Sequence, residues 1–251
     1  MDKLPSNFSI LLGQITYHCR LLLRMPRGIF SAFLVPVLVL LALHFVSGIS
    51  HISRANLYLI TGPITMGVVM TAYDSHALGL LTARTSGILK RMHGTPLPSW
   101  CYFVGRIIAT IIVCIVSSIA VLIVARTLYK FNLNLGIILQ IAFAVALGAL
   151  AWATIGTAIT RLIHDAKSGQ TILSAIYLPL LFVSGTFSSF ASEPKWVQTL
   201  AKFFPARPIS QGIEHILSNS GFNLISLSDY AVLIAWALLG MIVSILSFRW
   251  E

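Results

Sequence analysis

The sequence predicts an all-α protein that crosses a membrane several times, and three observations lead to that fold class. Hydrophobic residues make up 57% of the 251 residues, only 10% are charged, and the mean hydropathy is +0.89. A water-soluble fold of this length could not bury so much apolar surface. The apolar residues also gather into runs of about 20, the length that an α-helix needs to cross roughly 30 Å of hydrocarbon. Lipid is therefore the solvent in which this fold has to be explained.

Residues 1–27 are predicted to form an amphipathic helix before the first membrane span. Apolar residues recur at spacings of three and four, which places them on one helical face: Leu4, Phe8, Leu11, Leu12, Ile15, Cys19, Leu22 and Leu23. Ser6 or Asn7 can cap the start, and Pro26 stops or kinks the helix. The segment lacks a compact apolar core followed by a small-residue cleavage site, so we expect no removed signal peptide. Two placements stay open for this helix, one in the cytosolic interface and one packed against the protein's own spans.

Six apolar runs are predicted to cross the membrane, and together they form one domain over residues 28–251. The expected spans are 28–48, 57–81, 101–125, 135–160, 168–187 and 228–248. An even number of spans puts both termini on one side. If that side is the cytosol, eleven of the 17 Lys and Arg residues lie in or beside inside connectors, as the positive-inside rule requires. We therefore expect both termini in the cytosol.

The connector at 84–100 is predicted to contain a short helix. The stretch is basic and polar, Gly94 is suited to ending a helix, and Pro96 and Pro98 cannot continue one. Trp100 then anchors the next span at the level of the lipid headgroups. From the residues alone, a generic basic loop on the cytosolic side is an equal alternative.

The connector at 188–227 is predicted to form a two-helix hairpin that dips into the outer leaflet. One helical face of its first part carries Trp196, Leu200 and Phe203. Pro205 and Pro208 break that first helix, and Ile209–Leu217 can form a second one. Irregular backbone at membrane depth requires protein or water to satisfy its polar groups, and a hairpin meets that requirement. A plain extracellular loop is the alternative.

The sequence contains no pattern of a catalytic or metal centre. It has no G-x-x-x-x-G-K-[ST] loop for nucleotide phosphates and no H-E-x-x-H zinc helix. Ser184-Gly185 lacks the preceding glycine and the paired histidine of a membrane serine protease. The histidines are scattered, and the three cysteines have neither disulfide nor metal-ligand spacing. We expect a non-catalytic chain without a metal site, and without nucleic acid as a partner because the basic residues form no single face.

Asp74 is the one acidic candidate for an ion-coupled pathway. Asp74 and Glu214 are the acids nearest to membrane depth, and the other acids lie at termini or in connectors. An acid beside His76 in the second span is a group that could relay protons or cations. The alternative is a helix-end group that reaches water near the cytosolic face.

Together these features resemble one transporter family. The N-terminal helix, the six spans, the pattern Arg-x-x-Gly-x-x-x-Arg-x-x-x-Thr-Pro-Leu at 84–97 and the hairpin from Ser184-Gly185 to Pro208 are similar to the type-2 exporter permeases of ATP-binding-cassette (ABC) transporters. The resemblance covers nearly the whole chain and looks most like the separate-chain permeases of multidrug-resistance exporters of the daunorubicin type and of nodulation-factor exporters. It implies a permease subunit that exports an amphipathic substrate, such as a drug, a lipid or a glycolipid, across the bacterial plasma (inner) membrane.

The resemblance also implies that residues 84–95 form a coupling helix that docks on a separate ATPase. The contact residues that it implies are Arg84, Gly87, Ile88, Leu89, Arg91, Thr95 and Pro96. Closure of two ATPase subunits could then reach the membrane through this stiff element, with the N-terminal helix bracing the same interface. The family often has an acidic residue directly before the arginine of this loop. This chain has Ala83 there, so any salt bridge of that acid is missing.

The family further implies a dimer of two permeases, identical or homologous, that binds two ATPase subunits and lies in membrane lipid. The residues expected along the path are Tyr73, Tyr177, Phe182 and Phe187, although each could instead face lipid or pack in the core. Those expected in the hairpin are Trp196, Leu200, Phe203 and Pro205. ATP and Mg would bind the partner ATPase, and no cofactor would bind this chain. Two alternatives remain: an ion-gradient-driven carrier or channel that uses Asp74, and a membrane anchor or assembly factor without transport of its own.

Overall fold

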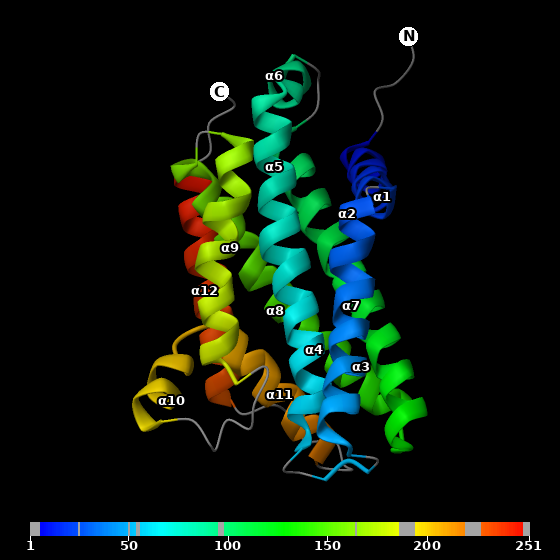
Figure 1. Ribbon diagram of the computed structural model, residues 1–251. Coiled ribbons are helices and arrows are strands. Elements are labelled where there is room, and N and C mark those ends of the chain that lie inside the picture. The colour runs from blue at the N-terminus through cyan, green and yellow to red at the C-terminus, as the bar shows by residue number, and fades with distance from the viewer. Residues whose placement is uncertain are drawn as a thin grey trace.

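The computed structural model describes residues 6–24, 26–49, 51–53, 56–94, 98–163, 165–185, 194–218 and 227–247. These residues form helices and their connecting turns, with no strand among them. The predicted all-α class is therefore confirmed for the described part of the chain. Figure 1 shows the long helices side by side, with shorter helices at both ends of the bundle.

The long helices are built from elements that follow one another in the chain. The first consists of α2 (Pro26–Ile29), the π-helical segment η1 (Phe30–Leu34) and α3 (Val35–Ser47). The second consists of α4 (Tyr58–Val69), the π-helical segment η3 (Met70–Ser75) and α5 (His76–Thr85). The others are α7 (Ser99–Tyr129), α8 (Leu135–Ile159) with the 3₁₀ turn η4 (Thr160–Leu162), α9 (Ala166–Val183) and α12 (Leu227–Ser247).

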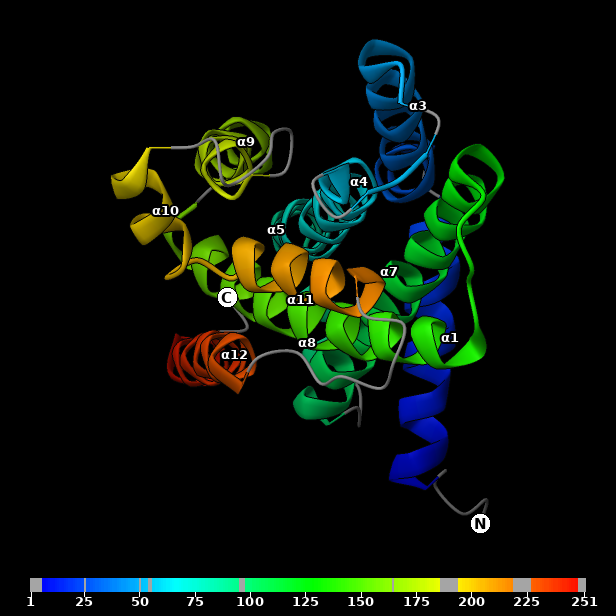
Figure 2. The ribbon, with the colours of Figure 1, turned by 90° about the horizontal axis from the view of Figure 1, so that it is seen from below.

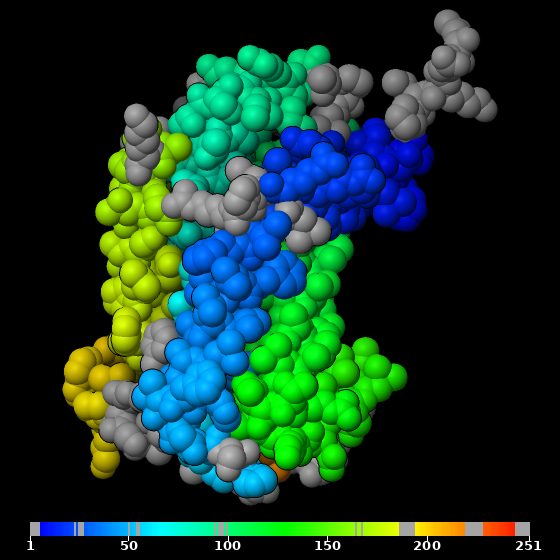
Figure 3. Space-filling view, turned by 45° about the vertical axis from the view of Figure 1, so that its right-hand side comes forward, coloured from blue at the N-terminus to red at the C-terminus, as the bar shows by residue number. Residues whose placement is uncertain are grey.

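The two ends of the bundle differ. At one end, which we call the α6 end, lie α1 (Asn7–Arg24) and α6 (Ile88–His93). At the other, the α11 end, lie α10 (Lys195–Ala201) and α11 (Ala206–Ser218). Viewed along the bundle in Figure 2, α11 crosses the end face while α10 sits at the periphery. Figure 3 shows α1 lying crosswise to the long helices near the α6 end.

Three helices in the described residues are long and apolar enough to cross a membrane. They are Phe30–Ser47, Trp100–Tyr129 and Leu135–Leu162, which correspond to the predicted spans 28–48, 101–125 and 135–160. Two further apolar helices are shorter, Ser168–Val183 and Ser228–Val243. The number of six spans stays a prediction.

The core forms around α8, which packs against α7, α11 and α12. Trp152 of α8 is 1% exposed, and its ring meets that of Tyr73 edge to face at 5.4 Å. At the α11 end the backbones of α8 and α11 come close, since a Cβ on Gly148 would lie 2.4 Å from Ile209 Cδ1. A glycine at position 148 thus lets α11 sink onto the bundle.

A proline and a serine account for one contact between the first long helix and α7. Pro36 has no N–H, so the carbonyl of Ala32, four residues earlier, loses its usual intrahelical donor. The hydroxyl of Ser117 in α7 donates to that carbonyl instead. In an apolar environment an unsatisfied carbonyl would be costly, and a side chain from the neighbouring helix removes the cost.

Helix α1 packs on the bundle with one side and leaves apolar side chains exposed on another. One side packs on α7, where a Cβ on Gly105 would lie 2.7 Å from Gln14 Cβ. Another side leaves Phe8 68% and Leu12 48% exposed. Exposed apolar side chains on a helix that lies across the bundle suit the interfacial region of a membrane.

Two predicted boundaries need correction. The helix expected at 84–95 is divided, because α5 continues to Thr85 and the short helix covers only Ile88–His93. Gly87 separates them with a φ of 71°, a left-handed conformation that glycine adopts without strain. Pro208, expected to break a helix, lies within the first turn of α11, where its missing N–H costs no intrahelical bond.

Candidate functional site

The most distinctive local structure at the α6 end is the corner between α5 and α6. Leu89 is 1% exposed and packs with Leu80, Ala83 and Tyr102, while Ile88 is 40% exposed. Arg91, on the next turn, is exposed as well. The helix is therefore anchored to the bundle by one apolar side chain and presents others outward. An element that is fixed on one side and exposed on the other is suited to docking.

Arg84 ties this corner to the end of α8. Its Nη1 donates to the backbone oxygen of Thr160 at 3.2 Å, and its Nη2 donates to the backbone oxygen of Ile163. Both acceptors belong to the turn that ends α8, where the Thr160 oxygen also accepts from the Ile163 N–H at 3.4 Å. A displacement of α6 would therefore move the end of α8 as well as α5.

The surroundings of Ala83 explain why an acidic residue would be unfavourable at this position. This side chain is 8% exposed and lies in the apolar cluster of Leu80, Leu89 and Tyr102. A carboxylate at this position would be buried among apolar side chains, which costs free energy unless it is paired. Two other predicted contact residues, Thr95 and Pro96, lie outside the described residues.

A buried polar cluster lies beneath α1, where it meets α5 and α7. Arg106 is 6% exposed, and its Nη2 donates to the His76 backbone oxygen at 2.9 Å and its Nη1 to the Tyr102 hydroxyl at 3.2 Å. The ring of His76 bonds to the hydroxyls of Thr110 and Thr157, with Nδ1 3.0 Å and Nε2 3.2 Å from them. These contacts join α5, α7 and α8 through side chains that the sequence separates by 34 and 81 residues.

His18 brings α1 into the same cluster. It is 2% exposed, and its ring meets that of Tyr102 edge to face at 5.0 Å. Burial, and after it the positive charge of Arg106, lower the pKa of His18 from 6.5 to about 3. The imidazole therefore stays neutral at physiological pH.

The predicted path residues divide into buried and exposed groups. Tyr73 is 0% and Tyr177 5% exposed, and their rings meet edge to face at 6.1 Å. Phe182 on α9 is 64% exposed, and Phe187 lies outside the described residues. Within one chain, Tyr73 and Tyr177 are thus packing residues between the second long helix and α9. They would reach a path only if these helices separated.

Asp74 lies beside these rings and is bound across the same helix contact. It is 7% exposed, and Nε2 of Gln170 donates to both of its carboxylate oxygens at 3.1 Å. The same amide nitrogen lies 3.1 Å from the hydroxyl of Ser174. Asp74 is therefore a buried residue that joins η3 to α9, rather than the helix-end group in water that the sequence leaves as an alternative.

The predicted hairpin residues at the α11 end are also partly exposed and partly buried. Trp196 and Leu200 are 66% and 47% exposed on α10, and Phe203, 67% exposed, lies in the turn that follows this helix. Pro205 is buried at the start of α11. The stacked rings of Phe204 and Trp236, 6.4 Å apart, attach this corner to α12.

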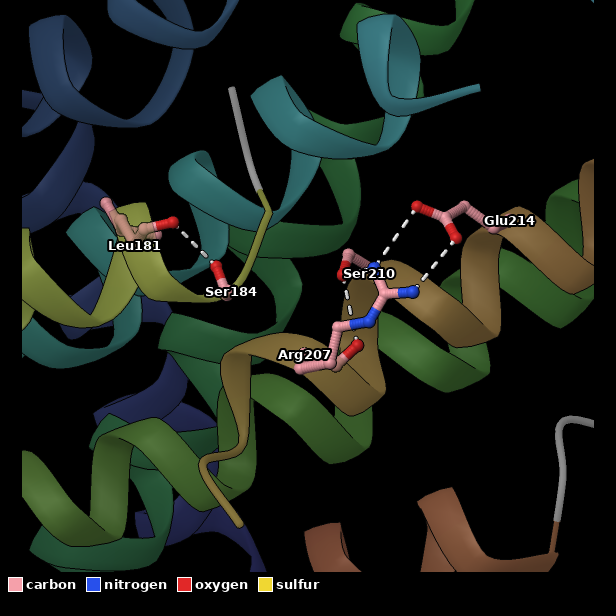
Figure 4. Close-up of polar contacts among 5 residues, drawn as sticks. All are labelled: Leu181, Ser184, Arg207, Ser210 and Glu214. Atoms are coloured by element: carbon pink, nitrogen blue, oxygen red, sulfur yellow. Dashed lines mark hydrogen bonds and ion pairs between the residues drawn. The ribbon is translucent and has the colours of Figure 1, made fainter. Parts of the chain in front are cut away.

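An ion pair on α11 is a feature that sequence reasoning missed. Arg207, 6% exposed, contacts both carboxylate oxygens of Glu214 at 3.4 Å and the hydroxyl of Ser210 at 3.4 Å (Figure 4). Figure 4 also shows the hydroxyl of Ser184 turned back to the carbonyl of Leu181 at the end of α9, a bond of 2.8 Å. The spacing of seven residues, two helical turns, is a signal that could have paired Arg207 with Glu214.

Comparisons with known proteins match the larger part of the chain. Residues 15–217 match the profile of the family described as ABC-2 type transporter. The transport permease ycf38 of Porphyra purpurea is 26% identical over 197 residues, which cover 77% of this chain. The matched part spans 66% of that relative's own length, just under two thirds. Among the described residues, no group of three or more His, Cys, Asp or Glu side chains could hold a metal ion.

Proposed function

The chain belongs to the ABC-2 type transporter family, and from that premise we propose that it is the permease subunit of an exporter powered by a separate ATPase. The proposal rests on the structure of the corner between α5 and α6, which is fixed to the bundle on one side and exposed on the other. Leu89 and Arg84 anchor this corner to the bundle, while Ile88 and Arg91 face outward. ATP and Mg would bind the partner, and this chain would supply the membrane path.

The proposed coupling runs from the ATPase through α6 into the bundle. Closure of two ATPase subunits is a rigid-body motion, and it moves the membrane part only through elements packed on both. Here α6 is packed on α5 and α7 through the cluster of Leu80, Ala83, Leu89 and Tyr102. The bonds of Arg84 extend the connection to the end of α8. A motion of α6 would thus reach three of the long helices.

The proposed topology has six spans, both termini in the cytosol and a place in the bacterial plasma membrane. In that orientation the α6 end faces the cytosol and the α11 end faces outward. The exposed rings of Trp196 and Phe203 would then lie in the outer leaflet, and the exposed apolar face of α1 in the inner one. Two permeases, identical or homologous, would form the path with two ATPase subunits.

The proposed cargo is an amphipathic molecule that enters from the lipid side. Phe182 on the exposed side of α9 is the path residue best placed for such entry. Tyr73 and Tyr177, whose rings meet between the second long helix and α9, would line the path once these helices move apart.

The proposal is tested by affinity purification of the tagged protein from its native membrane, with and without Gly87→Pro. Proline cannot adopt the φ of 71° at this position, so the variant displaces α6. Trp196→Ala, an exposed site at the α11 end, is the matched control. We expect a Walker-motif ATPase to co-purify with the wild type and the control, and to be lost with Gly87→Pro.

A second candidate, an ion-driven carrier, is favoured by one observation, the burial of Asp74 with its bonds to Gln170. It predicts that no ATPase co-purifies and that flux follows an ion gradient and stops in Asp74→Asn. That pair of results would replace the exporter proposal.

A further inference from the structure

A small, partly open cavity lies beneath α1, at the junction of three elements. Its volume is about 30 Å³. It is lined by His18, Leu21 and Leu22 of α1, by Ser75, His76 and Gly79 of the second long helix, and by Arg106 and Thr110 of α7. One wall is apolar, and the other is formed by polar side chains. The proposed exporter function does not use this cavity.

The charge in the cavity wall is not balanced within the described part of the chain. Arg106 is 6% exposed and, among the described residues, bonds only to two neutral oxygens, those of His76 and Tyr102. The one ion pair among the described residues is that of Arg207 with Glu214, at the other end of the bundle. A guanidinium that is removed from water without a negative partner is costly, more so than a neutral polar group.

Two hydrogen-bonding atoms of the cavity wall are unused. Arg106 Nε and His18 Nε2 are both buried and have no bond in the described part of the chain. Nε of arginine is always a donor, and Nε2 of a neutral histidine is a donor in one of its two tautomers. The hydroxyl of Ser75 lies 3.0 Å from that of Ser31, which is also within bonding distance of the Gly28 oxygen; when Ser31 donates to Ser75, the single hydrogen of Ser75 is free to donate to an anion. The wall therefore offers donors together with an uncompensated positive charge.

We propose that this cavity binds one small monovalent anion of halide size, held by Arg106, His18 and Ser75. The volume fits one halide ion or about two water molecules, and it is too small for a phosphate headgroup. An anion is favoured over water because it neutralises Arg106 as well as accepting hydrogen bonds. The bound ion would connect α1 to the second long helix and to α7, and would thus hold α1 on the bundle.

The experiment measures thermal unfolding of the purified full-length protein in detergent at constant ionic strength, with sodium gluconate replaced stepwise by chloride or bromide. Gluconate is too large for the cavity, so the wild type should gain several degrees in a saturable way as the halide rises. Arg106→Gln should lose this gain. Arg91→Gln, which removes an exposed cation from α6, should keep it.

A second variant covers the case in which Arg106→Gln does not fold. Ser75→Ala retains the cation and the cavity but removes one hydroxyl, so its half-saturating chloride concentration should rise about tenfold. An unsaturable gain that is equal in all variants, or no gain in the wild type, would overturn the proposal and leave water as the occupant. The proposal would also be overturned if Ser75→Ala kept the half-saturating chloride concentration of the wild type and Arg106→Gln kept the halide-dependent gain in unfolding temperature.

Discussion

Single buried polar residues connect the helices of this protein. His76 bonds to threonines from α7 and α8, and Asp74 bonds to Gln170 from α9. Such bonds have no substitute in an apolar environment, where water cannot satisfy the groups that they join. The sequence showed Asp74 and His76 as candidate polar groups of the second span. It could not show their partners, because these lie 34 to 96 residues away.

At the same scale, His18 predicts a pH dependence of stability. Its pKa is lowered in the folded state to about 3, so the folded state favours the neutral ring. This contribution is present above the unfolded pKa of 6.5 and is lost as the pH falls from there towards 3. At pH 5 the loss amounts to about 2 kcal/mol.

The measurement compares the unfolding temperature of the wild type and His18→Phe between pH 7.5 and 5 in halide-free buffer. Phe keeps the ring contact with Tyr102 and removes the titration. The acid titrations of the carboxylates are common to both proteins. We expect the wild type to lose more stability in acid than the variant does, and parallel pH profiles would contradict the account.

The ion pair on α11 predicts an asymmetry between single and double substitutions. Glu214→Gln leaves Arg207 buried without its carboxylate, whereas the side chain of Glu214 is 24% exposed and partly solvated. We expect a loss of about 1–2 kcal/mol, between the values of surface and buried pairs. The double change Arg207→Met with Glu214→Leu should recover most of it, because it removes both charges of the pair. Thermal unfolding in detergent measures both. Equal stability of Glu214→Gln and wild type would show that the pair contributes nothing.

At the scale of elements, the sequence predicted long helices but did not predict the π-helical segments or the helix boundary that interrupt them. Apolar runs predicted three of the long helices to within a few residues, because twenty apolar residues in lipid have few alternatives to a helix. The π-helical segments η1 and η3 carry no comparable signal, since each depends on neighbours such as Ser31 and Ser75, which bond to each other across the two segments. Gly87 could have located the boundary between α5 and α6, because a glycine is favoured where a helix ends.

We expect truncation of Leu89 and of Ile88, which are adjacent on α6, to change the hydrogen exchange of this helix to different extents. Leu89→Ala removes the buried anchor, and truncation of a buried leucine costs about 2–5 kcal/mol. Local opening of α6 should therefore increase the hydrogen exchange of its amides by roughly thirtyfold or more. Ile88→Ala, at a 40% exposed position, is the control and should change exchange little. Equal exchange in the two variants would mean that Leu89 does not hold α6.

At the scale of the whole molecule, the two ends of the bundle have different structures. The α6 end combines a crosswise helix, an anchored short helix and a buried cation, whereas the α11 end has a helix sunk onto α8 and exposed aromatic side chains (Figures 1 and 2). The resemblance of the sequence to exporter permeases predicted the N-terminal helix and the short 84–95 helix at one end and the hairpin at the other, but not the buried cation or the packing of α11 on α8. The packing of α8 against α11, α12 and the second long helix was not predictable, since these elements are distant from it in sequence.

The proposed function requires that the α6 end binds an ATPase. Site-specific photo-crosslinking in native membranes tests it most directly, with the photoreactive residue placed at Ile88 on the exposed side of α6 or at Trp196 on α10 at the opposite end. We predict that position 88 yields a product containing a Walker-motif ATPase and that position 196 yields none. A product at position 196, or no ATPase at position 88 in membranes that contain the folded protein, would contradict the claim.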